Sequence, residues 1–486
     1  MSKPFFLTTT LPYVNAPLHM GHALEFVRAD TIARYKKILG YDVYFNTGTD
    51  EHGLKIFEKA KEKGIEVQAF VDQGFETFKK QIKMFGVLDN IKFIRTTDKK
   101  HEKIAQDFWR VVDKNGYIYK KSYKAKYCVG CESEKTDSEL ENGECPHHAG
   151  QELKTIDEEN YFFKYSLFEE KLLKLYEDNK DFVVPDFRLN EIKNFVNGGL
   201  QDFSISRLKE KMPWGIEVPG DSSQVMYVWF DALTNYISTL ADENTETIDQ
   251  LIQSENFKKY WIEGNPTQYC GKDNTRFQGA MWQAMLMASG LPSSHQIIVN
   301  GFITADKGIR MSKTLENVVD PRDIVKEYGT DALRYFLLRE VSSFEDSPFT
   351  IERFKDAYNS GLANGLGNLV SRVMTMAEKN LTEPISNKPN LVSINYNKAL
   401  DQFDPKRAID VVWEFIAIAD RNIQEKEPFK LIKINKEEAV KVIRELVFQL
   451  SNIADLLTPF LPNTSEIIKD LIHQNKKPEQ PLFLRK

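Results

Sequence analysis

Residues 5–40 contain the feature that most constrains the fold, the short motif HMGH at positions 19–22. Residues 5–11 are apolar and β-branched enough for a buried strand, and the two prolines that follow end it. From His22 to Ile38 apolar residues recur at helical spacing, with Gly40 as the C-terminal cap. A strand, a loop and a helix form the first half of a βαβ unit. We therefore expect the motif at the carboxyl end of a strand, where open α/β sheets bind ligands.

The HMGH motif suits a phosphate site, because the free N–H groups of a helix N-terminus attract anions and imidazoles can bind them. By itself the motif is short, and His19 and His22 could equally belong to a metal site or a polar cluster. A second loop strengthens the phosphate interpretation. Residues 308–314, of sequence GIRMSKT, place Arg310 and Lys313 three residues apart, with a hydroxyl group on each side of Lys313. Two such cations can hold phosphate oxygens while charge moves to a leaving group.

Other segments extend the predicted sheet. A strand at residues 41–46 would bring Asp50 to the same edge of the sheet as the two histidines. Amphipathic helices are expected at residues 64–86 and 99–116. Residues 225–236 are expected to return to this sheet and to turn from a strand into a helix.

Three of the four cysteines cluster near a histidine. Cys128 and Cys131 have two residues between them, and Cys145 and His148 repeat that spacing about 13 residues further on. Three thiolates and one imidazole form a tetrahedral set of the kind that zinc prefers, although free thiols in a flexible loop are the alternative. No acid or base pattern lies nearby, so one structural zinc ion per chain is expected. Cys270 is expected to be a small buried hydrophobic residue.

Length and composition exclude several classes of protein. A chain of 486 residues is longer than one core usually serves, and 41% hydrophobic residues can fill several cores. A net charge of −6 argues against a protein that coats nucleic acid indiscriminately, so any RNA contact needs a local basic face. The sequence shows neither a run of about 18 apolar residues nor a targeting peptide, so no membrane is expected as a partner. The cytoplasm is the expected compartment, where clustered cysteines suit a metal better than disulfides.

The last third of the sequence is predicted to be helical. Apolar residues recur at helical spacing over residues 361–380, 408–423 and 437–457. Two prolines then interrupt the pattern before a last helix at residues 465–472.

The HMGH loop at residues 19–22 and the GIRMSKT loop at residues 308–314 resemble two loops of class I aminoacyl-tRNA synthetases. In that class, HIGH-like and KMSKS-like loops together hold ATP. Further phrases narrow the resemblance to the methionyl-tRNA synthetase family and extend it over nearly the whole chain. These phrases are LPY at 11–13, GTDEHG at 48–53, ISR at 205–207, WG at 214–215, VMYVWFDALTNY at 225–236, GKD at 271–273 and NVVDP at 317–321.

The resemblance implies an α/β fold, with a Rossmann-like parallel-sheet catalytic domain, an inserted zinc-knuckle domain and a C-terminal α-helical bundle. The implied catalytic domain has two halves, residues 1–116 and 223–300. The insertion at 117–222 is rich in lysine and glutamate and is expected to form short strands. A linking domain with the KMSKS-like loop is expected at 301–355, and the anticodon-binding bundle at 356–486.

The resemblance also implies a ligase that joins methionine to ATP, releases pyrophosphate, and passes methionine to the 3′ end of tRNA(Met), including the initiator tRNA. Attack of the methionine carboxylate on the α-phosphorus needs no protein nucleophile, so positioning and charge stabilisation carry the catalysis. Mg²⁺ is expected with ATP. The chain is expected to be a monomer, because no dimerising module follows the bundle.

Four groups of site residues follow from the resemblance. The catalytic residues are His19, His22, Arg310 and Lys313, and the ATP-binding residues are His19, Gly21, His22, Glu25 and Lys313. The methionine-binding residues are Leu11, Tyr13, Asp50, Trp229, Ala232, Tyr236 and Gln278. In that pocket Asp50 offers a negative charge to the substrate ammonium, and the aromatic rings offer an apolar wall to the thioether. Each ring taken singly could equally fill a core. The anticodon-binding residues are Asn368, Arg372 and Phe429.

Five of these residues carry an alternative interpretation or depart from the family pattern. Asn368 and Arg372 are four residues apart on one predicted helix, which by spacing alone fits an ordinary solvated face. The family usually has lysine at Arg310, and a planar guanidinium grips phosphates differently from an ammonium. The family commonly has histidine at the position of Gln278, and a glutamine amide, unlike an imidazole, cannot titrate. It frequently has tryptophan at the position of Phe429, whose ring still offers a π-face, although a smaller one than an indole.

Other functions compete with this interpretation. Synthetases for valine, isoleucine or leucine typically carry a long editing insertion, whereas the insertion here is occupied by the zinc-knuckle region. Synthetases for cysteine use a catalytic zinc in the amino-acid pocket, whereas the clustered cysteines of this chain lie in the insertion. A non-catalytic tRNA-binding paralogue would not need the charged residues of both ATP loops. A nucleotidyltransferase of small metabolites would leave the helical C-terminal third unexplained.

Overall fold

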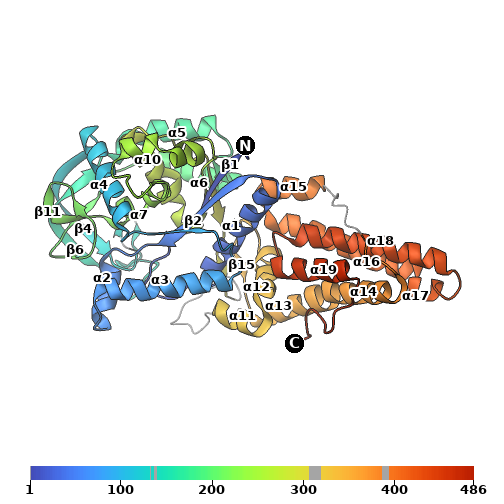
Figure 1. Cartoon of the computed structure of the whole chain (residues 1–486). Coiled ribbons are helices and arrows are strands. Elements are labelled where there is room, and N and C mark those ends of the chain that lie inside the picture. Colours follow the sequence, from blue (N-terminus) through green and yellow to red (C-terminus); the bar gives the residue numbers. More distant parts are fainter. Residues whose placement is uncertain (1, 132, 136–138, 306–318, 386–392) are drawn as a thin grey trace. The chain divides into compact units, whose positions relative to one another are not determined.

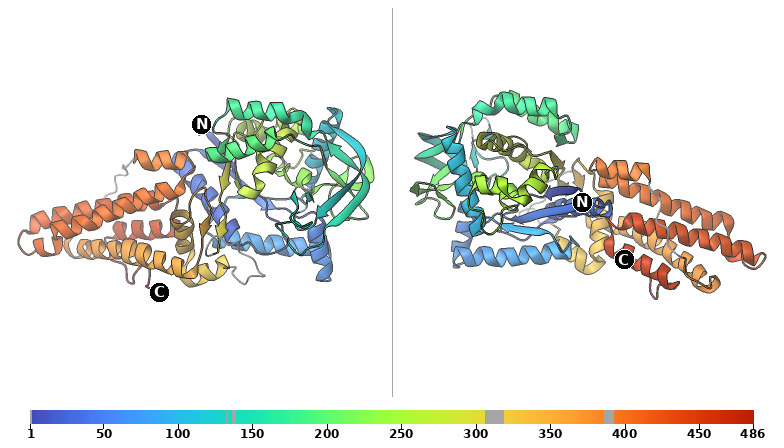
Figure 2. Two further views of the ribbon diagram at one scale, coloured as in Figure 1. Left: turned by 180° about the vertical axis from the view of Figure 1, so that it is seen from behind. Right: turned by 45° about the horizontal axis from the view of Figure 1, so that its top comes forward.

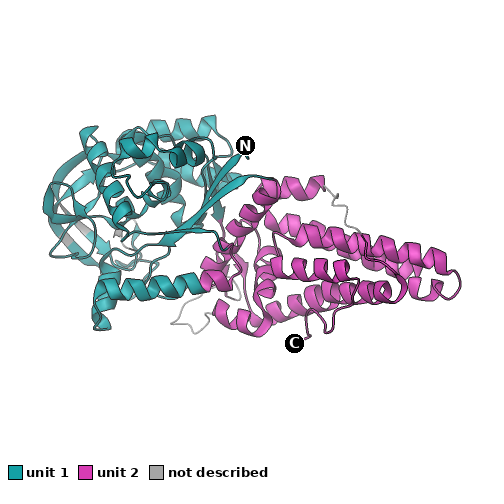
Figure 3. Cartoon of the chain, viewed as in Figure 1, with its two compact units in different colours: residues 1–18, 40–80, 89–299 teal, residues 19–39, 81–88, 300–486 magenta. Residues whose placement is uncertain are grey.

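The computed structural model describes residues 2–131, 133–135, 139–305, 319–385 and 393–486. Contacts between residues divide the chain into two compact units, which Figure 3 colours separately. Unit 1 comprises Met1–Leu18, Gly40–Lys80 and Asp89–Val299, and unit 2 comprises His19–Leu39, Gln81–Leu88 and Asn300–Lys486. The helix that opens with the HMGH motif therefore belongs to unit 2, although the strand before it belongs to unit 1. The boundaries of the five segments proposed from the sequence remain predictions.

A six-stranded sheet organises unit 1 in the order β3-β2-β1-β12-β13-β7. Its strands are β1 (Pro4–Thr8), β2 (Asp42–Thr49), β3 (Lys92–Arg95), β7 (Val183–Val184), β12 (Thr267–Gly271) and β13 (Gln296–Asn300). Strand β1 pairs in parallel with β2 on one side and with β12 on the other. The strand order reverses between β1 and β12, so the carboxyl ends of these strands form a topological switch point, where open α/β sheets bind ligands.

Helix α4 (Lys99–Lys114) shows why the predicted helices form where they do. Its apolar residues recur every three or four positions, and Phe108 and Trp109 are buried on that face. The ring of Trp109 lies 5.2 Å from that of Phe230, and the ring of Phe108 lies 5.9 Å from that of Trp282. Helices α1 (Met20–Ile38) and α3 (Val67–Met84) also match the predictions, whereas the nine-residue α2 (Leu54–Glu62) was not predicted.

The region between residues 117 and 222 holds longer elements than the short strands predicted there. Strands β4 (Ile118–Cys128) and β6 (Lys154–Phe163) pair antiparallel in a sheet of order β5-β4-β6-β8, with β5 (Ser133–Lys135) and β8 (Phe203–Ser204) at its edges. Helices α5 (Glu169–Asp178) and α6 (Asp186–Asn197) follow β6 and β7. Strand β7 joins the parallel sheet beside β13. The many lysines of β4 obscure the alternation of apolar and polar residues that would predict a long strand. Strand β7 has only two residues, which is too short for any such pattern.

Residues 225–236 turn from a strand into a helix as predicted, but they do not return to the parallel sheet. Strand β11 (Asp221–Met226) lies between β10 (Glu217–Val218) and β9 (Ser206–Leu208) in a separate antiparallel sheet. It leads into α7 (Val228–Ala232) and α8 (Asn235–Ser238). The prediction was wrong about the sheet because an apolar strand pattern does not identify the strand's partners.

Unit 2 consists mainly of helices, as Figures 1 and 2 show. The predicted C-terminal helices are present as α14 (Asn368–Asn380), α16 (Pro405–Lys426), α18 (Lys436–Leu457) and α19 (Pro462–Gln474). A π-helical segment, η9 (Tyr358–Gly367), runs directly into α14. The other elements are β14 (Ile303–Thr304), α11 (Pro321–Tyr328), α12 (Thr330–Tyr335), η8 (Phe336–Glu340), β15 (Ser347–Pro348), α13 (Ile351–Ala357), α15 (Ile394–Asp401) and α17 (Pro428–Leu431). Every helix in the described ranges is too short or too polar for a membrane span.

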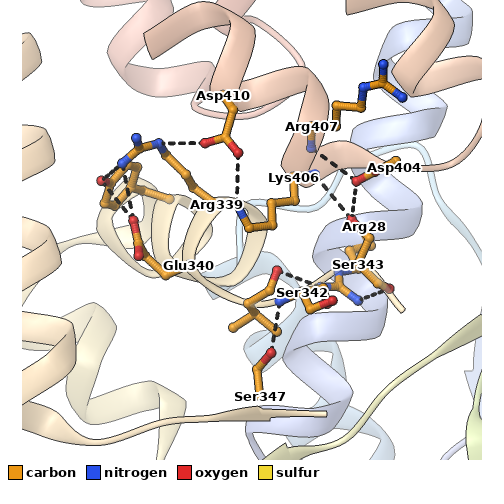
Figure 4. Close-up of polar contacts among 12 residues, drawn as sticks. Arg28, Arg339, Glu340, Ser342, Ser343, Ser347, Asp404, Lys406, Arg407 and Asp410 are labelled. Carbon is orange, nitrogen blue, oxygen red and sulfur yellow. Dashed lines mark hydrogen bonds and ion pairs between the residues drawn. The ribbon is translucent and has the colours of Figure 1, made fainter. Parts of the chain in front are cut away.

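Helix α1 is tied to the rest of unit 2 by buried charges. The Arg28 guanidinium, 1% exposed, donates to the side-chain oxygen of Asn300 and to the carbonyl oxygens of Val341, Ser342 and Ser343. The Ser343 hydroxyl in turn donates to the Asp404 carboxylate at the start of α16, at 2.6 Å (Figure 4). Two residues further along α1, the Asp30 carboxylate lies 2.8 Å from the Arg334 guanidinium of α12. These contacts fix α1 against the helical unit.

Candidate functional site

The HMGH histidines cap the N-terminus of α1. His19 is the N-cap residue, and its Nδ1 accepts hydrogen bonds from the backbone N–H groups of Gly21 (3.1 Å) and His22 (3.4 Å). The His19 N–H donates to Nδ1 of His22 at 3.3 Å, which completes a capping box. The prediction that this helix end offers free N–H groups was therefore wrong for Gly21 and His22, because His19 already accepts from them.

This capping arrangement also orients the two imidazoles. Their rings stack at 3.7 Å between centroids, with 14° between their planes. Burial, and then the neighbouring His19 imidazole, lower the pKa of His22 well below its ordinary value. Since both Nδ1 atoms accept hydrogen bonds, Nε2 is the nitrogen that carries the proton in the neutral form of either ring. The two Nε2–H groups are donors suited to phosphate oxygens.

Of the remaining predicted catalytic and ATP-binding residues, the structure describes Glu25 but not Arg310 or Lys313. Glu25 is buried on α1, one turn beyond His22. Arg310 and Lys313 lie outside the described residues, so their predicted role stays a prediction. The described chain resumes before α11, whose N-cap Asp320 accepts from the backbone N–H of Arg322 at 2.8 Å.

Two predicted methionine-binding residues lie next to each other in unit 1. Tyr13 and Asp50 form a parallel β-bridge beyond the ends of β1 and β2. The Asp50 N–H donates to the carbonyl of Pro12 at 3.1 Å, and the Val14 N–H donates to the carbonyl of Asp50 at 3.3 Å. The Asp50 side chain is 5% exposed. The bridge therefore fixes the phenol-bearing and carboxylate-bearing loops side by side at the switch point.

A second pair joins α7 to the segment that follows β12. The Trp229 indole stacks on Phe277 with 3.8 Å between centroids and 4° between planes. The next residue, Gln278, is 1% exposed. Among the residues that the structure describes, its side-chain Oε1 and the Trp229 Nε1 have no hydrogen-bond partner. A buried amide oxygen without a donor is costly in an empty protein interior and is suited to a polar ligand group.

The other three predicted pocket residues lie on α7, on α8 and in the loop after β1. Ala232 lies on α7 with Trp229, and Tyr236 lies on α8, and both are buried. The Tyr236 ring packs 5.9 Å from that of Trp282. Leu11 is partly buried in the loop after β1. All seven predicted methionine-binding residues belong to unit 1.

The predicted metal ligands gather into one cluster. One ligand atom each from Cys128, Cys131, Cys145 and His148 lie within 4.8 Å of one another. Nδ1 of His148 is 3.3 Å from Sγ of Cys131 and 3.6 Å from Sγ of Cys128. A tetrahedral zinc site with these atom types has ligand atoms about 3.6–3.8 Å apart. The cluster therefore matches a metal site of three thiolates and one imidazole, with no open position for a substrate.

Gly130 lets this cluster close. A Cβ atom at Gly130 would lie 2.4 Å from the His148 ring, which is far below van der Waals contact. Only glycine can therefore occupy this position while His148 faces the three thiolates. Cys270, the remaining cysteine, is fully buried in β12, as predicted.

Two predicted anticodon-binding residues line one cavity in unit 2. This cavity, of about 330 Å³, lies between α14, α16 and α17 and is lined by Ser371, Arg372, Thr375, Met376, Ile423 and Phe429. The Arg372 guanidinium is held by the Asp420 carboxylate at 2.6 Å, and the Phe429 ring is 47% exposed. Asn368 is exposed one turn earlier on α14 and does not line the cavity.

Comparison with known proteins accounts for these features together. The sequence matches the family described as tRNA synthetases class I (M) over residues 5–156 and 149–374. It is 40% identical to the methionine--tRNA ligase of Caldanaerobacter subterraneus subsp. tengcongensis, over 96% of this chain and 73% of that protein. The chain belongs to the methionyl-tRNA synthetase family. It is therefore an aminoacyl-tRNA ligase of class I.

Other members of the methionyl-tRNA synthetase family are similar to this chain in sequence and in structure. The methionine--tRNA ligase of Brucella suis biovar 1 is 35% identical, over 97% of this chain and 92% of that protein. The structure of Mycobacterium tuberculosis methionyl-tRNA synthetase in complex with methionyl-adenylate superposes with a TM-score of 0.88 at 34% identity, covering 96% of this chain and 94% of that one. The apo form of the same enzyme superposes with a TM-score of 0.82 at 30% identity, covering 100% and 99%.

The sequence did not point to three further polar residues that the structure buries near these elements. His52, His101 and Asp231 are each at most 4% exposed and join through hydrogen bonds in unit 1. His52 and Asp231 are 179 residues apart, so spacing does not reveal the contact. The available signals are an aspartate inside the apolar segment WFDAL and a histidine two residues after Asp50.

Proposed function

We propose that this chain activates methionine with ATP to form methionyl-adenylate and pyrophosphate, and then transfers methionine to the 3′ end of tRNA(Met), including the initiator tRNA. The observation that carries the proposal is the similarity, at a TM-score of 0.88, to a methionyl-tRNA synthetase solved in complex with methionyl-adenylate. The Tyr13–Asp50 bridge and the Trp229–Phe277 stack support the same assignment in this chain.

Within unit 1, the proposed methionine pocket comprises Leu11, Tyr13, Asp50, Trp229, Ala232, Tyr236 and Gln278. The Asp50 carboxylate would pair with the substrate ammonium, and the aromatic rings would pack against the flexible thioether. Gln278 would use its buried side-chain amide to hydrogen-bond the bound amino acid. The pocket then selects methionine by shape together with a small number of polar contacts.

The proposed ATP-binding residues are His19, Gly21, His22, Glu25 and Lys313, with Arg310 as a further catalytic cation. His19 and His22 would donate from Nε2 to phosphate oxygens, as their capping contacts at Nδ1 favour. Arg310 and Lys313 would hold the departing pyrophosphate. Mg²⁺, when bound with ATP, supplies neutralisation of the phosphate charge.

The metal proposed for the cluster of three cysteines and His148 is a single structural zinc ion, because the donor set and its spacing match zinc. For tRNA, we propose that an anticodon base stacks on Phe429 while Arg372 and Asn368 contact the same loop. The monomeric state and the cytoplasmic location remain predictions.

The proposal is tested by charging purified methionine tRNA with radiolabelled methionine in the presence of ATP and Mg²⁺. Methionine should become attached to the 3′ end of the tRNA, and omission of ATP should abolish the product. Oxidation of the tRNA 3′ diol with periodate provides the control, since it removes the acceptor and leaves the enzyme unchanged. ATP-dependent methionine activation without any transfer to intact tRNA would contradict the second half of the proposed reaction.

A further inference from the structure

A buried carboxylate lies between two histidines in unit 1. Oδ2 of Asp231 is 2.7 Å from Nδ1 of His52, and Oδ1 of Asp231 is 2.8 Å from Nε2 of His101. His101 continues the chain of contacts through Nδ1, which is 2.8 Å from the Ser238 hydroxyl. All three titratable side chains are almost fully buried, so water cannot replace these contacts. We call Asp231, His52 and His101 the buried triad.

Three of the elements that carry predicted pocket residues contribute to this network. His52 lies in the loop that carries Asp50, and Asp231 lies on α7 between Trp229 and Ala232. Ser238 lies on α8, two residues after Tyr236. His101 comes from α4, which carries no predicted pocket residue and has a large buried apolar face. The triad therefore joins two pocket elements, the Asp50 loop and α7, to one helix of the core, and the contact with Ser238 extends the network to α8.

The loop around His52 is also held from its other side. The Trp214 ring packs edge-on against the His52 ring at 5.7 Å, and the Trp214 Nε1–H donates to the carbonyl of Glu51 at 2.5 Å. The Glu51 carboxylate accepts from the Arg95 Nε–H at 2.8 Å. The position of the Asp50 loop thus depends on His52 and Glu51 together, while α7 is held to that loop through Asp231.

The charges of the triad support one another. Burial opposes protonation of His52, but Asp231, Glu102 and Glu51 all favour it, and together they raise the pKa of His52 above its ordinary value. Burial likewise opposes ionisation of Asp231, but His52 and His101 outweigh it and lower the pKa of Asp231. Ionisation of Asp231 and protonation of His52 therefore favour each other, and a charge-assisted hydrogen bond between them is stronger than an uncharged one.

We propose that Asp231, held by His52 and His101, is a positioning residue that sets the methionine pocket by fixing α7 against the Asp50 loop. The inference rests on the proposed function, since it concerns how methionine is bound. The triad does not contact the substrate in this account. It holds Asp50 at a fixed separation from Trp229 and Ala232, so its loss should weaken methionine binding and leave ATP binding unchanged.

The pH dependence of methionine binding gives the proposal a direction. A histidine whose pKa is raised by folding contributes stability below its unfolded pKa and loses it as pH rises through the folded pKa. The KM for methionine should therefore rise as pH increases above about 6.5, the unperturbed histidine value. In His52→Asn, an amide donor replaces Nδ1 without a charge, so this part of the pH profile should become flat.

The test is methionine-dependent ATP–pyrophosphate exchange by the full chain, with KM measured separately for methionine and for ATP. Asp231→Asn should raise the KM for methionine about 10-fold to 100-fold, because a misplacement of binding groups by about 1 Å can cost about 100-fold, and the KM for ATP should not change. His52→Ala should behave like Asp231→Asn, and His52→Asn should recover most of the methionine affinity at low pH. His101→Gln, which keeps a donor near the Nε2 position, serves if Asp231→Asn fails to fold.

Asp331→Asn is the matched control, because Asp331 is a buried carboxylate of unit 2 that accepts from the Thr464 N–H and hydroxyl. It should lower Tm and leave the methionine KM and its pH profile unchanged. Loss of Tm in the triad variants with an unchanged methionine KM, or an equal rise in both KM values, would overturn the positioning role. Absence of methionine-stimulated exchange in the wild-type chain would instead overturn the proposed function.

Discussion

Gln278 stands where the resemblance to the methionyl-tRNA synthetase family leads us to expect histidine. It is buried, and its side-chain Oε1 has no hydrogen-bond partner in the described part of the chain. We expect Gln278→His to keep methionine activation within about threefold of wild type, because an imidazole can offer one hydrogen bond from a side chain of similar reach. Pyrophosphate exchange at saturating ATP measures this. A loss of 100-fold or more would mean that the pocket is shaped around the amide.

Phe429 is expected to act on tRNA and not on methionine. Phe429→Ala should slow tRNA charging about 10-fold, since stacking of one base on an aromatic ring contributes about 1–3 kcal/mol, and pyrophosphate exchange should not change. Phe448→Ala is the control, because Phe448 is a partly exposed phenylalanine of the same unit that lines a different cavity. Equal loss of charging and exchange in Phe429→Ala would favour a packing role.

Residues with a local spacing rule could be predicted from the sequence, and residues brought together only by the fold could not. Cys128, Cys131, Cys145 and His148 follow ligand spacing, and the structure gathers them into one cluster. Asp231 has no such rule, because it lies on α7 and its partner His52 lies in a loop 179 residues earlier. The capping by His19 was also missed, because the HMGH motif does not show that an imidazole occupies the backbone N–H groups.

At the scale of the element, helix α1 depends on buried ion pairs. Asp30 is fully buried and contacts both Arg334 (2.8 Å) and Arg34 (2.7 Å). Asp30→Asn should destabilise unit 2 by about 3 kcal/mol, because it leaves a buried guanidinium without its counter-charge. Urea unfolding followed by circular dichroism measures the change.

Asp401→Asn is the matched control for this prediction. Asp401 pairs with Lys36 of the same helix, but the Asp401 side chain is 54% exposed. Its loss should cost less than about 1 kcal/mol, as for other surface ion pairs. Equal effects of Asp30→Asn and Asp401→Asn would show that the buried pair does not anchor α1.

The cysteine cluster is a second element whose role can be measured. Cys131→Ser should reduce bound zinc from about one ion per chain to nearly none, because a neutral hydroxyl replaces a thiolate ligand. Elemental analysis of the purified protein measures the metal. Cys270→Ala should retain zinc, since Cys270 lies in the parallel sheet and outside the cluster. Full zinc content in Cys131→Ser would contradict the ligand assignment.

Elements with strong periodicity were predicted best. The long helices α16 and α18 match their predicted positions because their apolar faces recur over 22 residues each. Strand β11 was placed in the wrong sheet, because its partners β9 and β10 are short and carry no pattern of their own. Strand β7, with two residues, could be found only from its pairing with β13.

Across the whole molecule, the two groups of predicted active-site residues divide between the two units. The described methionine-binding residues belong to unit 1, whereas His19 and His22 belong to unit 2 with the helical C-terminal region. The sequence suggests instead a single catalytic domain, since the motif directly follows the first strand. Chain order does not show this division, because α1 is held to unit 2 by Arg28 and Asp30 through contacts with residues about 300 positions later.

The most direct test of the central claim is ATP–pyrophosphate exchange by the full chain with each of the twenty amino acids in turn. We predict that methionine alone stimulates exchange strongly, since the proposed pocket of the Asp50 loop, the aromatic rings and Gln278 would suit an unbranched thioether. Near-isosteres such as norleucine, added to the series, should give weaker stimulation. Strong stimulation by another of the twenty amino acids, or by none of them, would contradict the account.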